Sequence, residues 1–148
     1  MKISEIMAGG RPSLSFEVFP PKRRTASDAD AERAAMERTK RVVREIAAAH
    51  PAFMSVTYGA AGGTTGANTC ELARFVQDDC GVPALAHMTC IAADRAKVAD
   101  EVRGFRAAGV ENILCLRGDC PPDTEFPGNP AFCHAADLVR ALKGEGFC

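Results

Sequence analysis

The chain alternates short apolar runs with longer helical patterns along its whole length. Four strand-like runs recur at intervals of roughly 30 to 40 residues, the size of one βα unit with its loops. They cover residues 14–19, 53–58, 84–89 and 112–116. The segments between them carry apolar residues at helical spacing. The pattern therefore predicts a repeated strand-helix plan.

Helices are predicted after each of the four strands from capping and breaking residues. Their expected limits are Ser27 to Pro51, about residue 68 to Gly81, Asp94 to Gly109, and about residues 134 to 143. Strands that alternate strictly with helices form a parallel sheet with crossover helices. Both an open doubly wound sheet and a (β/α)8 barrel fit this plan. A barrel needs eight strands and about 250 residues. If the fold is a barrel, these 148 residues hold its first half, about four βα units.

Composition narrows the possible functions. The formal net charge is -1, and no basic stripe points to nucleic acid. No apolar run approaches about 18 residues, so no membrane span is expected, and the N-terminus does not read as a signal peptide. The seven cysteines are odd in number and include no C-x-x-C pair, which disfavours a disulfide framework and favours a reducing cytoplasm.

The first predicted strand carries an unusual carboxylate. Glu17 lies inside an apolar run that two prolines, Pro20 and Pro21, bring to an end. A strand buried on both faces normally reads as continuous Val, Ile, Leu or Phe. A carboxylate inside such a strand costs stability unless it is paired, protonated or used in chemistry. Glu17 is therefore predicted to be either a structural ion-pair partner or a catalytic acid.

Polar residues share one parity near the end of each predicted strand. Because side chains in a strand alternate between faces, each pair is expected to lie on one face. The pairs are Ser15 with Glu17, Ser55 with Thr57, His87 with Thr89, and Arg117 with Asp119. In parallel α/β folds, ligands bind at the carboxyl ends of the strands. The joint pattern predicts a binding site at this edge.

Four segments resemble the 5,10-methylenetetrahydrofolate reductase family, in that family's order and spacing. They read SFEVFPPK (15–22), MSVTYGA (54–60), AHMTCI (86–91) and NILCLRGD (112–119). The resemblance implies a TIM barrel that binds FAD at the carboxyl ends of its strands. Residues 1–148 would be the N-terminal half of that barrel. The implied reaction passes a hydride from NAD(P)H to FAD and then to methylenetetrahydrofolate, giving methyltetrahydrofolate for one-carbon and methionine metabolism.

The resemblance also implies roles for individual residues. Glu17 matches the catalytic acid that protonates the folate N10, which requires a carboxyl with a raised pKa. Asp119 matches the second catalytic residue, an acid near the flavin N1 and the pterin. The positions that would line the flavin or the nicotinamide are Thr57, Tyr58, Ala60, His87, Arg117, Gly118, Asp119 and His134.

The resemblance also implies binding partners, and two alternative functions remain open. Methylenetetrahydrofolate is the expected substrate, no metal is expected, and the chain is expected to form a homo-oligomer or to pair with a complementing C-terminal half-barrel. One alternative is a non-catalytic half-barrel that needs a partner chain. Another is a metal-dependent barrel enzyme with His87, Cys90, Cys115 and Cys120 as ligands, although their spacing matches no standard zinc pattern.

Overall fold

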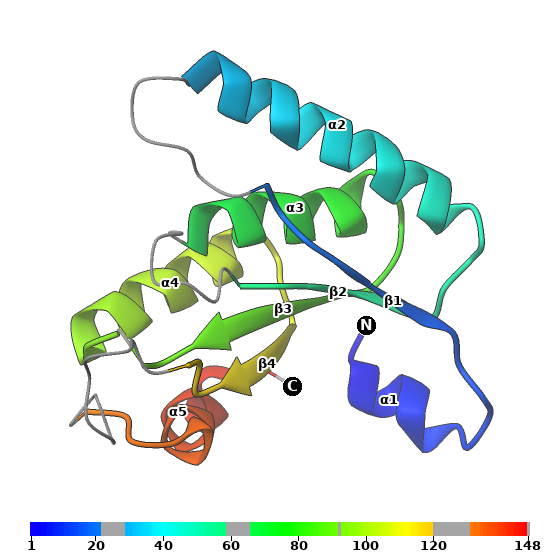
Figure 1. Ribbon diagram of the computed structural model, residues 1–148. Coiled ribbons are helices and arrows are strands. Elements are labelled where there is room, and N and C mark those ends of the chain that lie inside the picture. The colour runs from blue at the N-terminus through cyan, green and yellow to red at the C-terminus, as the bar shows by residue number, and fades with distance from the viewer. Residues whose placement is uncertain (22–28, 59–65, 92, 120–130, 148) are drawn as a thin grey trace.

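The computed structural model describes residues 1–21, 29–58, 66–91, 93–119 and 131–147. Four parallel strands form one sheet, with helices packed along it (Figure 1). The strands are β1 (Ser15–Val18), β2 (Phe53–Val56), β3 (Ala84–Thr89) and β4 (Asn112–Leu116). The helices are α1 (Ile3–Ala8), α2 (Ala29–Ala47), α3 (Gly66–Asp78), α4 (Arg95–Ala107) and α5 (Ala135–Leu142), followed by the 3-10 turn η1 (Lys143–Glu145).

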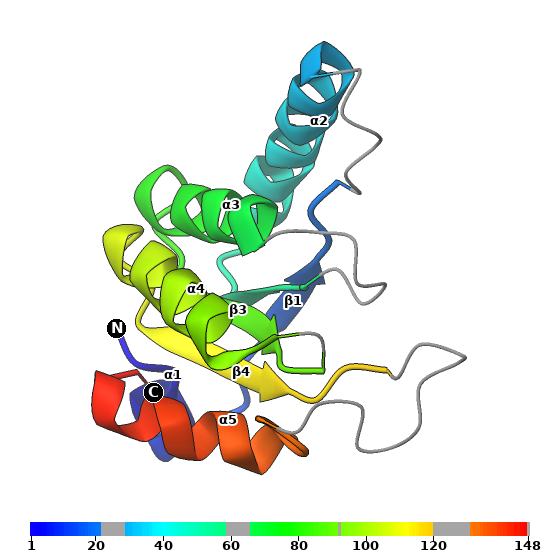
Figure 2. The ribbon, with the colours of Figure 1, turned by 90° about the vertical axis from the view of Figure 1, so that its left-hand side faces the viewer.

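The strand order decides between the two predicted architectures. The strands pair in sequence order, β1-β2-β3-β4, and every pair is parallel. Helices α2, α3 and α4 lie along one face of the sheet, and α5 packs against β4 at the end of that row (Figures 1 and 2). A doubly wound sheet would reverse its strand order and place helices on both faces. The sequential order is that of a (β/α)8 barrel, and the described residues form four of its βα units.

The core lies between the sheet and helices α3 and α4. Alternate strand residues point to this side, so Met54, Val56, Ala86 and Met88 are fully buried. Helix α3 adds Leu72 and Val76, and α4 adds Phe105. Burial of one such large apolar side chain stabilises the fold by about 1.5–3 kcal/mol. This helix-covered face fixes which residues remain for the opposite face.

The strand and helix predictions are confirmed with small shifts. The bounds of β3 and β4 agree with the sequence, while β1 and β2 are shorter than predicted. Asp94 caps α4 as predicted, because its Oδ1 accepts a hydrogen bond from the Lys97 backbone N at 2.7 Å. The predicted start of the first long helix, Ser27, lies outside the described residues.

Helix α1 was not predicted, and a tertiary contact holds it. Its N-cap position is Lys2, which makes no side-chain cap hydrogen bond. Instead, the Asn112 Oδ1 accepts from the Ile3 backbone N at 2.8 Å, and the Asn112 Nδ2 donates to the Met1 carbonyl at 3.1 Å. Asn112 is the first residue of β4, so α1 lies at the amino-terminal edge of the sheet. In the described part of the chain, no helix combines the length and apolarity that crossing a membrane requires.

Candidate active site

Glu17 and His87 meet on the sheet face that α2, α3 and α4 leave uncovered, which we call the open face. The Glu17 Oε2 lies 3.7 Å from the His87 Nε2. The two residues come from β1 and β3, with β2 between them. Strands two positions apart are separated by about 10 Å. The register pairs Glu17 with Ser55 of β2, whose small side chain leaves the space in which the two longer ones meet.

The two members of this pair differ in exposure. The Glu17 side chain is 50% exposed, whereas that of His87 is 8% exposed. Within the described residues, the strand that carries Glu17 is therefore buried on one face only. Val18 is buried on the helix-covered face, but no other layer of the described residues covers Glu17. The ion-pair interpretation and the catalytic interpretation of Glu17 both remain compatible with this geometry.

His87 is buried without a full set of partners. Its Nε2 has no hydrogen-bond partner within the described ranges, since 3.7 Å to Glu17 is too long for one. Burial lowers the pKa of His87, and the nearby Glu17 carboxylate opposes part of that decrease. The imidazole is therefore neutral near pH 7, with one buried nitrogen available to a ligand on the open face.

The lowered pKa of His87 predicts a pH-dependent stability. The folded state binds a proton at His87 less readily than the unfolded chain, so this contribution is present above the ordinary histidine pKa and is lost as pH falls below it. Between about pH 8 and about pH 5, wild type should therefore lose more unfolding free energy than His87→Gln. Urea denaturation at both pH values measures this difference. Equal losses in the two proteins would contradict the burial of His87.

The polar pairing predicted for the fourth strand is wrong. The register places Leu114 opposite His87 and Leu116 opposite Thr89, so these two leucines share the open face. Arg117 follows the last residue of β4 and has the opposite parity. Strand alternation does not extend past the strand's end. The open face carries polar residues toward the carboxyl ends of β1, β2 and β3, whereas β4 places two leucines there.

The Arg-Gly-Asp sequence directly follows β4, and backbone contacts fix its first two residues. The Arg117 carbonyl accepts a hydrogen bond from the Ile91 backbone N at 2.8 Å, and the Arg117 Nε donates to the Gly118 carbonyl at 3.0 Å. Gly118 has a φ of 85°, a left-handed conformation that favours glycine. Asp119 is exposed at the carboxyl-terminal edge of the sheet. This segment thus presents one cation and one carboxylate at the predicted edge.

Of the two described positions that were predicted to line the ligand after β2, Thr57 fits the open face and Tyr58 does not. Thr57 is half-buried, and its backbone N donates to the Val18 carbonyl of β1 at 3.0 Å, so the pairing with β1 continues one residue past β2 and Thr57 keeps the face of Ser55. Tyr58 is buried on the other side, where its hydroxyl donates to the Glu101 Oε1 of α4 at 2.6 Å. Its ring is therefore turned away from Glu17, and only its backbone is left for the predicted ligand contact. Ala60 lies outside the described residues.

His134 has a local structural role at the start of α5. It is the N-cap residue, and its backbone N donates to the Asp137 Oδ2 at 2.9 Å. Its ring Nδ1 lies 3.9 Å from the same oxygen, and its carbonyl accepts from the Cys90 Sγ at 3.8 Å. The imidazole is exposed. These contacts neither place it on the open face nor test its predicted role at the adenine.

The geometry of the described residues does not support the metal-site alternative. Within the described residues, no three His, Cys, Asp or Glu side chains lie close enough together to hold a metal ion, and Cys120 lies outside them. Burial raises the pKa of the Cys115 thiol to about 11 and also raises that of Cys90. Both thiols are therefore protonated near pH 7 when no metal is bound.

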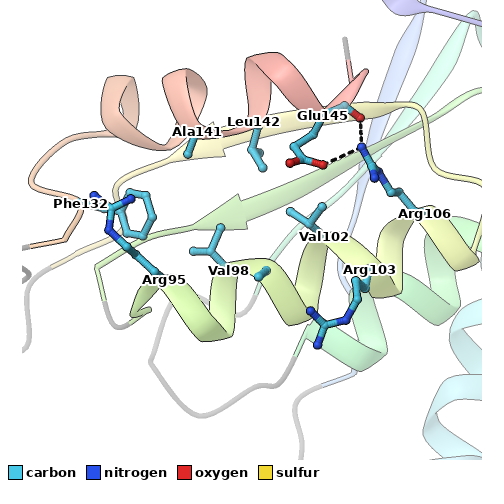
Figure 3. Close-up of a pocket in the computed structure, with 10 residues that line it drawn as sticks. Arg95, Val98, Val102, Arg103, Arg106, Phe132, Ala141, Leu142 and Glu145 are labelled. Atoms are coloured by element: carbon cyan, nitrogen blue, oxygen red, sulfur yellow. Dashed lines mark hydrogen bonds and ion pairs between the residues drawn. The ribbon is translucent and has the colours of Figure 1, made fainter.

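A hollow of about 330 Å³ lies between α4 and α5, away from the open face (Figure 3). Apolar side chains such as Val98, Val102 and Leu142 form its floor. The Arg106 guanidinium pairs with the Glu145 carboxylate at 2.7 Å across it. Neither Glu17 nor His87 lines this hollow, so it is separate from the candidate site.

Comparison with known proteins identifies the family. A model of the family described as methylenetetrahydrofolate reductase matches residues 2–148. The chain belongs to the methylenetetrahydrofolate reductase family. This membership agrees with the resemblance in the four motifs, and it identifies the four parallel βα units as part of the family's TIM barrel.

Relatives of the chain come from fungi, plants and bacteria. Methylenetetrahydrofolate reductase 2 of Schizosaccharomyces pombe is 33% identical over 156 residues, which cover 100% of this chain and 23% of the relative. The probable methylenetetrahydrofolate reductase (NADH) of Oryza sativa subsp. japonica is 35% identical, over 97% of this chain and 23% of the relative. The 5,10-methylenetetrahydrofolate reductase of Escherichia coli (strain K12) is 35% identical, over 90% of this chain and 40% of the relative. The chain thus spans about a quarter to two-fifths of the length of these relatives.

Sequence reasoning missed one residue next to the family's motifs. Glu101 contacts the tyrosine of the second motif, yet it was not singled out. Its position on α4 was the available signal, because it lies between the buried Val98 and Phe105 and beside Val102 at helical spacing. A carboxylate on the buried stripe of a helix is unusual enough to need a partner.

Proposed function

We propose that this protein takes part in the FAD-dependent reduction of 5,10-methylenetetrahydrofolate to 5-methyltetrahydrofolate, with NAD(P)H as the electron source. The setting is one-carbon and methionine metabolism in the cytoplasm. The observation that carries the proposal is the approach of Glu17 to His87, 3.7 Å apart on the open face of a sheet that belongs to this family. The motifs that supply the two residues lie on separate strands, and the fold brings them together.

Glu17 is proposed as the proton donor to the folate. Protonation of N10 weakens its bond to the bridging methylene carbon, so that the five-membered ring opens to an electrophilic iminium at N5. Hydride addition to that carbon then gives the methyl group. A carboxyl within reach of N10 is needed for this step, and general acids of this kind contribute about 10²–10⁴-fold to the rate. The half-exposed Glu17 can be reached from the open face.

The residues at the carboxyl-terminal edge fit a flavin. Bound FAD would accept a hydride from NAD(P)H and supply it to the folate. The buried His87 Nε2, which has no partner among the residues that the structure describes, and the half-buried Thr57 offer hydrogen bonds from the open face. The Arg117 guanidinium is suited to the pyrophosphate or ribityl region as a forked donor. Asp119 is proposed to lie near the flavin N1 and the pterin, where a carboxylate tunes the flavin.

The open face supports completion of the site by further barrel strands. Leu114 and Leu116 are 38% and 37% exposed there, and Glu17 is half exposed. Leucines exposed side by side on a sheet face favour a covering layer. We propose that the rest of the barrel, in the same chain or in a complementing one, supplies this layer. A non-catalytic half-barrel that only pairs with a partner chain would show the same exposed leucines. A measurement of flavin binding is therefore needed to distinguish the two functions.

The visible spectrum of the purified protein tests the proposal. We expect the 148-residue chain alone to retain FAD weakly or not at all, because it spans only part of the relatives' length and its open face is uncovered. The native gene product with a complete barrel should show one flavin per active site. Tight stoichiometric FAD on the 148 residues would contradict the first expectation. A colourless complete protein that does not take up added FAD would reject the proposed function.

A further inference from the structure

Tyr58 is joined to α4 on the side of the sheet opposite Glu17. Its hydroxyl donates to the Glu101 Oε1 at 2.6 Å, and its side chain is buried. Helix α3 closes the other side of the ring, because a Cβ added to Gly66 would lie 3.4 Å from the Tyr58 Cε2. The phenol therefore lies between α3 and α4 and cannot also touch a ligand on the open face.

The burial of Glu101 in this place lowers the stability of the fold. Its second oxygen, Oε2, is buried and has no hydrogen-bond partner among the residues that the structure describes. Burial raises the pKa of Glu101, while the bond from Tyr58 and the charge of Lys97 act in the opposite direction. A buried polar atom without a partner destabilises a fold and requires an explanation. An apolar residue at position 101 would pack without this cost, so packing alone does not explain the carboxylate.

The residue next to Tyr58 connects this pair to the candidate site. The Thr57 backbone N donates to the Val18 carbonyl of β1 at 3.0 Å, and its carbonyl accepts from the Thr69 Oγ1 of α3 at 3.0 Å. The Tyr58–Glu101 bond adds a third attachment, to α4. The end of β2 is thus held from three elements at the point where Thr57 presents its side chain to the open face.

We propose that Tyr58 and Glu101 act as positioning residues that fix Thr57 for ligand binding at the carboxyl-terminal edge. Tyr58 then contributes through its bond to α4 and not through its ring. The identity of the ligand, FAD, rests on the proposed function. The role of the pair in holding Thr57 can be tested without FAD and independently of the proposed function.

The first experiment measures hydrogen exchange of the Thr57 backbone amide by NMR. Tyr58→Phe keeps the ring and removes the hydroxyl, so we expect the Thr57 amide to exchange about tenfold faster. Glu101→Leu should have the same effect, and Glu101→Gln, which keeps an acceptor oxygen, should stay near wild type. Because the two residues act as one unit, the double variant Tyr58→Phe/Glu101→Leu should match the single ones and not add their effects. Asp78→Asn, at an exposed pair with Arg74 on α3, is the control.

The second experiment measures FAD affinity of the native gene product by fluorescence titration. We expect Tyr58→Phe and Glu101→Leu to raise the dissociation constant by about three- to tenfold, and Glu101→Gln to restore it. A fall in thermal stability with unchanged Thr57 exchange and unchanged FAD affinity would show a merely structural pair and overturn the inference. Faster exchange with unchanged affinity would overturn the link to the site. If wild type binds no FAD, the proposed function fails, and the Thr57 exchange alone decides whether the pair positions β2.

Discussion

Glu17→Gln is expected to abolish reduction of methylenetetrahydrofolate while leaving reduction of the flavin by NAD(P)H unchanged. Glutamine has nearly the same shape and polarity as glutamate, but it carries no proton that it can transfer to N10. Loss of a general acid lowers a rate by about 10²–10⁴-fold. Nicotinamide oxidation does not use this proton, so the first half-reaction should proceed at the wild-type rate. Anaerobic rapid-mixing measurements on the complete enzyme follow the two half-reactions separately.

The matched control is Glu45→Gln, which removes the same charge from an exposed position on α2. It should leave both half-reactions unchanged. Folate reduction by Glu17→Gln at more than about one-tenth of the wild-type rate would exclude Glu17 as the acid. Loss of both half-reactions together would instead indicate that Glu17 holds the site's structure. In that case the contact of Glu17 with His87 is structural, as the other interpretation of the sequence holds.

Gly118→Ala is expected to lower the free energy of unfolding by about 2–4 kcal/mol. The φ of 85° at this position costs a residue with a side chain about 1–2 kcal/mol. The new methyl group would also lie 2.9 Å from the Ile91 Cγ2 and 3.3 Å from the Thr89 Cβ, so the chain must shift. That shift moves the segment that carries Arg117 and Asp119. Urea denaturation measures the stability, and FAD titration of the complete enzyme should show weaker binding.

The variant Gly146→Ala separates the cost of backbone strain from the cost of the steric contact made by an added Cβ. Gly146 has a nearly equal φ of 82°, but an added Cβ would meet nothing within 4 Å. It should therefore lose only about 1–2 kcal/mol, the cost of the left-handed backbone. The difference between the two variants reports the contact with Ile91. Equal losses would show that the segment after β4 has room for a side chain and does not hold its residues tightly.

The repeating plan of the fold could be predicted because each signal is local. The apolar runs at 84–89 and 112–116 coincide with the observed bounds of β3 and β4. Alternation on β1, β2 and β3 correctly placed Glu17 and Ser55 on the face of His87. Helix α1 could not be predicted in this way, because its attachment through Asn112 joins residues more than 100 positions apart.

The wrong predictions about the candidate site also concern features that local sequence signals do not contain. Arg117 lies past the end of β4, where alternation no longer applies, and Leu116 takes the position on the open face. The burial of Glu17 depends on a layer above the open face, which a strand's own residues do not reveal. Glu101 carries a charge, and charged helix residues are usually exposed. Its buried bond to Tyr58 depends on a contact between β2 and α4 that only the tertiary structure shows.

A single anaerobic turnover of the native gene product tests the central claim most directly. The protein is loaded with FAD, reduced with NADH or NADPH, and mixed with methylenetetrahydrofolate. The account predicts that the nicotinamide bleaches the flavin, that the folate restores its colour, and that one methyltetrahydrofolate forms for each flavin reoxidised. A flavin that NAD(P)H bleaches but methylenetetrahydrofolate does not reoxidise would contradict the account.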